Sequence, residues 1–202
     1  MTTENNHSRR TRKLQKTSEQ LSQCAWQLFE SKGYEATTME IIAEAADVAR
    51  GTLYRHFPVK EAFIAYRFKQ DQLVHQEAVI TAAMACKDAW SGFTLVLSLE
   101  ASYAERMHEY LGPFLVYRLA GQQTTEQIGE DDIFFALSLS LIARGQRNGE
   151  FNTKTDALRL AEYLAFLRLA TLMRWLGDKT QPLLPLYEEM LQFFMHGAVF
   201  KN

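Results

Sequence analysis

Five polar side chains lie within seven residues, from Arg50 to His56, and their chemistry suits the binding of a nucleic acid. A guanidinium can donate two parallel hydrogen bonds to one guanine, while hydroxyl, phenol and imidazole groups can donate to phosphate oxygens. Leu53 and Phe57 are four residues apart in the same stretch, so a helix would turn both to one side. The spacing therefore predicts a short helix over about Arg50 to His56 with a polar face, and Phe57-Pro58 would end it.

A second short helix is expected just before this one, because the preceding stretch has helix-start signals and one apolar face. Thr37 and Thr38 can each cap its start, and Glu40 stands at the capping-box spacing from Thr37. The apolar side chains recur at helical spacing: Met39, Ile42, Ala43 and Ala46. Asp47 would then adopt the left-handed backbone of a sharp turn, and Val48 would fill the corner.

The two short helices must be supported by other elements, since a helix of one or two turns is not stable alone. Two such helices joined by a tight corner form the helix-turn-helix motif, whose second helix enters the DNA major groove. The sequence therefore predicts a helix-turn-helix within residues 37–60.

The same residues resemble a known family. Residues 45–62 read AADVARGTLYRHFPVKEA and residues 29–38 read FESKGYEATT, and both resemble the signature of TetR-family transcriptional regulators. The resemblance is dense from about residue 17 to residue 63, and beyond it only the helical pattern and the chain length resemble the family. Two positions depart from the usual pattern: Asp47 stands where Gly is common, and Val59 stands where a Ser, Asn or Asp cap is common.

The resemblance implies that eight residues bind DNA: Thr38, Arg50, Gly51, Thr52, Tyr54, Arg55, His56 and Lys60. Arg50 is the first candidate for base recognition and Thr52 the second, while Gly51 lets the backbone approach the DNA closely. The phosphates would be bound mainly by Thr38, Tyr54, His56 and Lys60. Arg55 could serve either purpose.

Helical periodicity continues through the rest of the chain, and no stretch predicts a strand. Residues 14–32 form an amphipathic helix that Gly33 would end, which completes a three-helix DNA-binding head over residues 1–60. A fourth helix is expected to run unbroken to about Ala85, and it opens a helical ligand-binding and dimerisation domain over residues 61–202. The expected fold is all-α with about nine helices.

Breaks in the pattern divide the remainder of the C-terminal domain. The predicted helices are residues 90–110, 113–121, 133–146, 153–176 and 182–200. The Gly112-Pro113 pair would separate the first two, and residues 122–129 would form a polar loop. Thr153 and Asp156 have the spacing of a capping box at the start of the helix predicted over residues 153–176.

The N-terminus is polar and basic. Residues 1–10 are expected to be disordered, and four cations form a basic arm: Arg9, Arg10, Arg12 and Lys13. This arm is either a solvated tail or a contact to phosphate or the minor groove beside the main site.

Composition excludes several classes of protein. The 202 residues carry a net charge of −2, but residues 1–70 hold 11 Lys and Arg against 8 Asp and Glu, whereas residues 71–202 hold 11 against 16. The basic excess coincides with the predicted head, although chance could produce so small an asymmetry. No apolar run reaches the roughly 20 residues of a membrane span, and no signal-peptide pattern or disulfide framework occurs. These features fit a cytoplasmic protein with no membrane partner.

The sequence offers little enzyme chemistry. It has no phosphate-binding glycine loop, and its five histidines lack metal-ligand spacing with Cys or carboxylates. The acidic run Glu130-Asp131-Asp132 fits a solvated helix start better than a metal site. We therefore expect no catalytic residue, no metal and no cofactor.

A stripe of large side chains is the candidate ligand site. It comprises Tyr103, Met107, Tyr110, Phe114 and Tyr117, and Arg168 and Trp175 are expected to join it, with His108 and Arg118 as further candidates. Such a stripe fits either plain core or a ligand site, since ligand sites are mostly apolar with a few placed polar groups. The family resemblance implies a ligand cavity here, and the side chains suggest an aromatic or amphipathic organic effector.

The last two helices predict a homodimer. Residues 158–176 are apolar on nearly every side, and the final helix carries Met190, Phe193, Phe194, Ala198 and Phe200. A helix that is apolar all round must bury more than one face, so a second subunit or a thick monomer core has to cover the other face. Two recognition helices in one dimer would read a pseudo-palindromic operator.

These features lead to one main hypothesis for function. The chain is expected to be a repressor that a small effector releases from its operator, although the same sequence would suit a ligand-assisted activator. A helical small-molecule carrier or enzyme with a vestigial head is a second possibility. A DNA-organising protein without an effector is a third.

Overall fold

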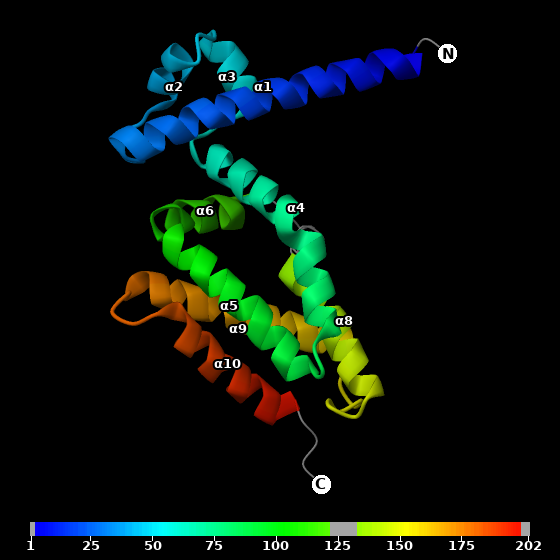
Figure 1. The fold of residues 1–202 in the computed structure, drawn as a ribbon. Helices are drawn as coiled ribbons and strands as arrows, with labels where there is room; N and C mark the ends of the chain where they lie inside the picture. Colours follow the sequence, from blue (N-terminus) through cyan, green and yellow to red (C-terminus); the bar gives the residue numbers. More distant parts are fainter. Residues whose placement is uncertain (1–2, 122–132, 199–202) are drawn as a thin grey trace. The chain divides into compact units, whose positions relative to one another are not determined.

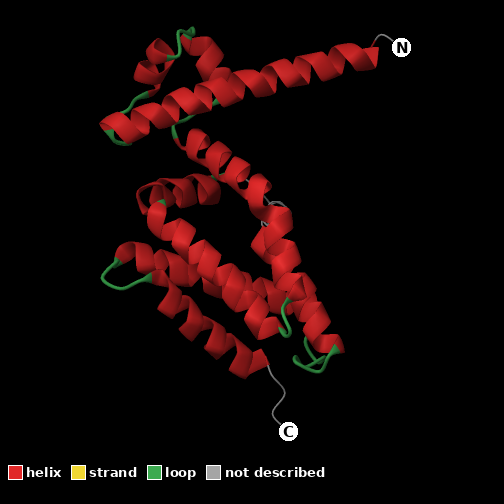
Figure 2. Ribbon diagram, in the orientation of Figure 1, coloured by secondary structure: helices red, strands yellow, loops and turns green. Residues whose placement is uncertain are grey.

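The computed structural model describes residues 3–121 and 133–198, and it describes the side chains of residues 12–121 and 133–196. Within those ranges every regular element is an α-helix, nine in all, and no strand occurs (Figure 2). The prediction of an all-α fold with about nine helices is therefore confirmed. The chain forms two compact units, residues 1–72 and 73–202, and the boundary falls inside one helix. The functional division at residues 60 and 61 stays a prediction.

The N-terminal unit contains one long helix, two short helices and the beginning of a fourth (Figure 1). They are α1 (Thr3–Lys32), α2 (Met39–Ala45), α3 (Arg50–His56) and α4 (Glu61–Ala85). α1 packs against α2, and α2 packs against α3. The shared core consists mainly of Leu21, Ala25, Trp26, Phe29, Ile42, Leu53, Phe57, Phe63 and Ile64. Because α2 and α3 have seven residues each, this core is what stabilises them.

α1 is longer than the sequence predicted. It begins at Thr3, so the expectation of a disordered tail over residues 1–10 is wrong for residues 3–10. No Gly or Pro interrupts the stretch up to Lys32, and the helix therefore has no local reason to start later. Gly33 ends it in the left-handed conformation, with φ of 85°, as predicted. The side chains of Arg9 and Arg10 lie outside the described residues.

The polar residues at the start of α2 do not form the predicted capping box. Thr38 is the N-cap of α2, and its Oγ1 accepts a hydrogen bond from the Ile41 N–H at 3.3 Å. Thr37 is fully buried, and its hydroxyl donates to the Gly33 carbonyl at 2.8 Å instead of capping a helix. Asp47 has a φ of 51°, so the prediction of a left-handed turn residue is confirmed.

The C-terminal unit contains the rest of α4 and five further helices. They are α5 (Ala89–Arg106), α6 (His108–Ala120), α8 (Ile133–Arg147), α9 (Ala157–Gly177) and α10 (Leu183–Ala198). α8 packs on α9 and α5, and α10 packs on α5 and α9. α6 lies against α5 and α9. These contacts place the predicted ligand stripe on helices that are neighbours in space.

The break between α5 and α6 lies at Met107 and not at Gly112-Pro113, so that prediction is wrong. Pro113 lies inside α6, where it removes the hydrogen bond to the carbonyl of Glu109 one turn earlier. Glu109 is exposed, so its carbonyl is near water, and the helix can tolerate the loss. His108 stabilises the junction, because its Nδ1 lies 2.9 Å from the Glu105 carbonyl oxygen.

Acidic side chains cap several helices of this unit. Asp156 is the N-cap of α9 and accepts from the Leu158 N–H at 2.9 Å, so the predicted capping box opening at Thr153 is wrong. Glu105 on α5 accepts from the Leu183 N–H at 2.8 Å and thereby caps α10 from a neighbouring helix. α10 starts at Leu183, one residue after Pro182.

Some predicted features fall outside the described residues. They are the polar loop at 122–129, the acidic run at 130–132, the side chain of Ala198 and all of Phe200. Among the helices that the structure does describe, none combines the length and the apolar character needed to cross a bilayer.

Candidate functional site

The recognition candidate α3 is anchored by two side chains. Leu53 is completely buried and Phe57 is 3% exposed, as the spacing predicted. The Phe57 ring stacks on Phe63 with ring centroids 3.9 Å apart, and it meets Tyr66 edge-on at 5.5 Å. α3 has no side-chain cap at its N-terminus, so these contacts hold the helix in place.

The outer side of α3 is polar and open. Arg50, Gly51, Tyr54 and Arg55 are exposed, and Thr52 is half-buried. A methyl group added at Gly51 would meet no atom within 4 Å, so this position offers a close approach to an incoming backbone. Four of the eight predicted DNA-binding residues are therefore freely accessible on one short helix.

Tyr54 has an acidic neighbour on α2. The Tyr54 hydroxyl donates a long hydrogen bond, 3.4 Å, to Oε1 of Glu40. The pKa of Glu40 is below its ordinary value, first because of its own backbone N–H, then because of Thr38, Arg50 and Tyr54. In the sequence Glu40 is recognisable only as a helix-start residue, and its contact with α3 appears only in the folded structure.

His56 is tied to α1. Its Nδ1 lies 2.9 Å from Oγ of Ser18, 38 residues earlier in the chain. Burial lowers the pKa of His56, and the nearby Arg55 lowers it further. His56 is therefore a packed contact between α3 and α1 as well as a candidate phosphate ligand.

Lys60 is also engaged within the unit. Its Nζ donates to the Tyr34 carbonyl at 2.7 Å and lies 3.9 Å from the centre of the Tyr34 ring. The Tyr34 hydroxyl in turn donates to Glu61 at 3.0 Å, and burial followed by Glu61 raises the pKa of Tyr34. Lys60 thus connects the start of α4 to the segment between α1 and α2. The proposed phosphate contact would have to compete with these interactions.

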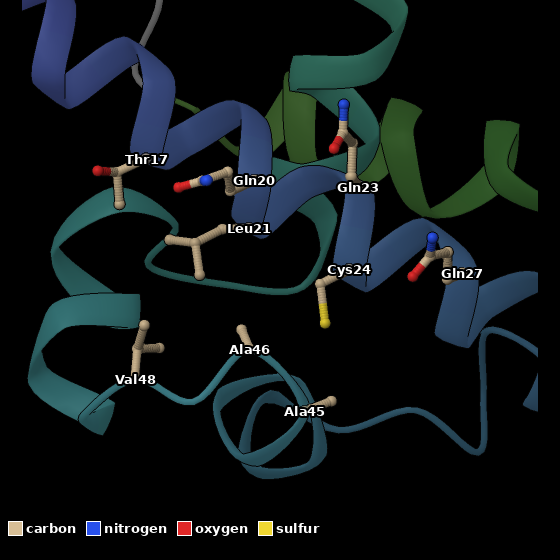
Figure 3. Close-up of a pocket in the computed structure, with 9 residues that line it drawn as sticks. All are labelled: Thr17, Gln20, Leu21, Gln23, Cys24, Gln27, Ala45, Ala46 and Val48. Atoms are coloured by element: carbon tan, nitrogen blue, oxygen red, sulfur yellow. The ribbon is translucent and has the colours of Figure 1, made fainter.

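A groove of about 430 Å³ lies between α1 and the corner that follows α2 (Figure 3). Its lining residues are Thr17, Gln20, Leu21, Gln23, Cys24, Gln27, Ala45, Ala46 and Val48. Leu21 and Cys24 point from α1 toward the corner (Figure 3). Burial raises the pKa of the Cys24 thiol, so this sulfur stays protonated and weakly nucleophilic at neutral pH.

The predicted ligand residues are distributed over three packed helices. Tyr103 lies on α5 and Met107 at the junction, and Tyr110, Phe114 and Tyr117 share one face of α6. Trp175 on α9 is 4% exposed, and its indole N–H donates to the Gln181 carbonyl at 3.0 Å. That bond fixes the ring in the core, and the role of Trp175 in ligand binding stays a prediction.

Arg168, the other α9 candidate, belongs to a polar cluster that the sequence analysis did not assemble. Arg168 Nη1 lies 2.8 Å from Oε1 of Glu100 on α5, and the Tyr187 hydroxyl donates to the same oxygen at 2.9 Å. The guanidinium lies 4.3 Å from the centre of the Phe134 ring. Glu100 is the one charged residue between positions 89 and 104, and this isolated charge in an apolar helix is the sequence feature that could have indicated a partly buried ion pair.

The residues that the structure describes contain no group of three or more His, Cys, Asp or Glu side chains placed to hold a metal ion.

Comparison with known proteins agrees with the geometry of the N-terminal unit. The profile of the family described as "Bacterial regulatory proteins, tetR family" matches residues 23–66, which contain the corner and α3. The HTH-type transcriptional regulator TcmR of Streptomyces glaucescens is 49% identical over 59 residues, which are 29% of this chain and 26% of TcmR. The helix-turn-helix region of this chain, residues 23–66, therefore matches the TetR family.

Two longer similarities extend beyond the family profile. The HTH-type transcriptional repressor KstR of Mycolicibacterium smegmatis is 27% identical over 144 residues, 71% of this chain and 69% of KstR. A crystal structure of Thermus thermophilus FadR, a TetR-family repressor in complex with lauroyl-CoA, matches with a TM-score of 0.78 over 92% of this chain and 96% of that one. At 21% identity this second likeness shows the fold alone.

Replacing Lys60 by Met should lower the free energy of unfolding by about 1–2 kcal/mol, because the Tyr34 carbonyl and ring both lose a cationic partner. Chemical denaturation measures the change. The exposed Lys16, replaced by Met, is the control and should shift the free energy by under about 0.5 kcal/mol. Equal losses in the two variants would mean that Lys60 is not held by Tyr34.

His56 should make stability depend on pH. The folded chain resists protonation of His56 because its pKa is lowered, whereas the unfolded chain accepts the proton near the ordinary value of about 6.5. Stability is therefore lost as the pH falls from about 6.5 toward the lower folded pKa. Between pH 7.5 and 5.5, the melting temperature of His56→Gln should fall less than that of the wild type. The exposed His75, replaced by Gln, should leave the profile unchanged, and a His56→Gln profile parallel to the wild type would refute the assignment.

Proposed function

We propose that this protein is a homodimeric, ligand-responsive DNA-binding regulator that represses transcription in the cytoplasm. The observation that carries the proposal is α3, which is anchored by Leu53 and Phe57 and exposes Arg50, Tyr54 and Arg55. A short helix that is buried on one side and polar on the other can enter the DNA major groove and contact the bases there. The family description and the names of TcmR and KstR support a role in regulation.

A small organic effector would bind in the C-terminal unit. Supporting features are the aromatic face of α6 and the cluster of Glu100, Arg168 and Tyr187, which adds polar groups to apolar walls. The lauroyl-CoA bound by Thermus thermophilus FadR makes an amphipathic acyl compound a reasonable first probe. If effector and DNA favour different arrangements of the dimer, each must weaken the binding of the other by the same factor.

The homodimer would form through α9 and α10. α9 buries Leu160, Leu164, Leu172 and Trp175 on one side, yet Tyr163, Phe166 and Met173 on the other side are 52%, 63% and 49% exposed. On α10, Phe193 is 71% exposed. Large apolar side chains in a helical stripe favour contact with a second apolar surface, and a second copy supplies an identical one.

Selection of bound sequences from a random DNA pool tests the proposal directly. A pseudo-palindromic site with half-sites about one helical turn apart is the expected result, and binding should fall steeply with salt. The same complex is then titrated with acyl-CoA compounds. Enrichment of no sequence would favour a carrier or enzyme with a vestigial head, while selective binding that no ligand changes would favour a DNA-organising protein.

Replacing Arg50 by Ala should weaken binding to the selected site by about 1–3 kcal/mol and relax the preference at one base position per half-site. Repeating the selection with the variant locates that position. Replacing Lys60 by Ala is the comparison, and it should weaken binding to every sequence and reduce the salt slope by about one. If Arg50→Ala weakened binding equally on all sequences, Arg50 would be a phosphate contact.

Replacing Phe166 by Glu should convert the dimer into a monomer at micromolar concentration, because a charge would be placed in the apolar contact. Sedimentation velocity measures the change. The control is Val116→Glu on α6, which puts the same charge on a side chain that is 69% exposed but off the α9 stripe. A dimer that survives Phe166→Glu and dissociates with Val116→Glu would place the interface on α6.

A further inference from the structure

Glu40 is an exposed acidic side chain on α2 that reaches the exposed Tyr54 of α3. It lies in the first turn of α2, and its Oε1 lies 3.4 Å from the Tyr54 hydroxyl. Tyr54 is a candidate DNA ligand, and so is Arg50 at the start of the same helix. A carboxylate beside Tyr54 would repel a phosphate that Tyr54 could bind.

A purely structural role would be that of an acid at a helix N-terminus, which is favourable in any helix. That role does not require contact with a second helix. The Glu40 carboxylate reaches across to α3, where its Oε1 accepts a hydrogen bond from the Tyr54 hydroxyl. Glu44, one turn further along α2, is also exposed and carries the same charge, so it provides an internal comparison.

We propose that Glu40 is a specificity-determining residue, which occupies the Tyr54 hydroxyl in the free protein and repels the backbone of non-cognate DNA. This inference rests on the proposed function, since it presupposes that α3 binds DNA. It goes beyond that function because it assigns the discrimination against wrong sequences to a residue that does not belong to α3.

The physical reason lies in the difference between the two kinds of complex. Non-specific binding is almost entirely the electrostatic attraction of cations to phosphates, so a nearby carboxylate weakens it directly. In the cognate complex, Arg50 can form two hydrogen bonds to a guanine, and this gain offsets the repulsion between Glu40 and the phosphates. Glu40 therefore lowers the affinity for wrong sites more than the affinity for the operator, which is a repulsive route to specificity.

The test compares Glu40→Gln with Glu44→Gln, two variants that remove the same charge from the same helix. Each is titrated with the selected operator and with a scrambled duplex of equal length, at several salt concentrations. Glu40→Gln should raise affinity for the scrambled duplex about three- to fivefold, change affinity for the operator by less than about twofold, and steepen the non-specific salt slope by about one. Glu44→Gln should change both affinities by the same small factor.

A double-mutant cycle with Tyr54→Phe examines the route of the effect. If Glu40 acts partly through the Tyr54 hydroxyl, the gain from Glu40→Gln should be smaller in the Tyr54→Phe background. Thermal unfolding of each variant confirms that the N-terminal unit remains folded.

Three outcomes would overturn the inference. Glu40→Gln and Glu44→Gln could give the same ratio of operator to scrambled affinity, or Glu40→Gln could raise both affinities equally. In those cases the wild type still binds its operator and the proposed function stands. A wild-type protein that binds no DNA selectively would overturn the proposed function and this inference together.

Discussion

The burial of Leu53 and Phe57 is the interaction on which the exposed face of α3 depends. A seven-residue helix without a side-chain cap gains too few internal hydrogen bonds to persist alone. Its position is therefore set by two apolar side chains and by the stacked ring of Phe63. With Leu53 and Phe57 buried, Arg50 and Tyr54 remain exposed on the same short helix. The same short helix therefore contributes both to stability and to recognition. If the packing of Leu53 and Phe57 were lost, the polar groups of α3 would no longer be held together.

The same packing divides the polar residues into two kinds. Arg50 and Arg55 are exposed on α3 and can meet a ligand directly. Lys60 and His56 are instead bonded to Tyr34 and Ser18, so they stabilise the unit before any DNA arrives. A helix-turn-helix can combine exposed residues with residues bonded inside the unit. Contacts to phosphates position the protein on the DNA and do not read its sequence. Residues that hold the motif together are then well placed to bind the backbone too.

The C-terminal unit shows how one helix can serve two surfaces. α9 contributes Leu164 and Trp175 to its own core, and on its opposite side Phe166 and Met173 remain uncovered. The inner face also carries Arg168, whose charge is compensated by Glu100 at 2.8 Å. A desolvated guanidinium without such a partner would be costly, so the pair keeps a polar group inside an apolar bundle. The proposed effector site and the proposed dimer contact therefore lie on opposite faces of one helix.

The sequence by itself determined the helices, the corner and the inward residues of α3. Helical spacing and turn preferences are local, so Leu53, Asp47 and Gly33 have the roles that their neighbours in the chain predict. Only the tertiary structure decided which polar groups meet. Glu100 pairs with Arg168 across 68 residues, and Ser18 meets His56 across 38. Such outcomes depend on which helices pack together, and no local spacing encodes the distance between side chains on different helices.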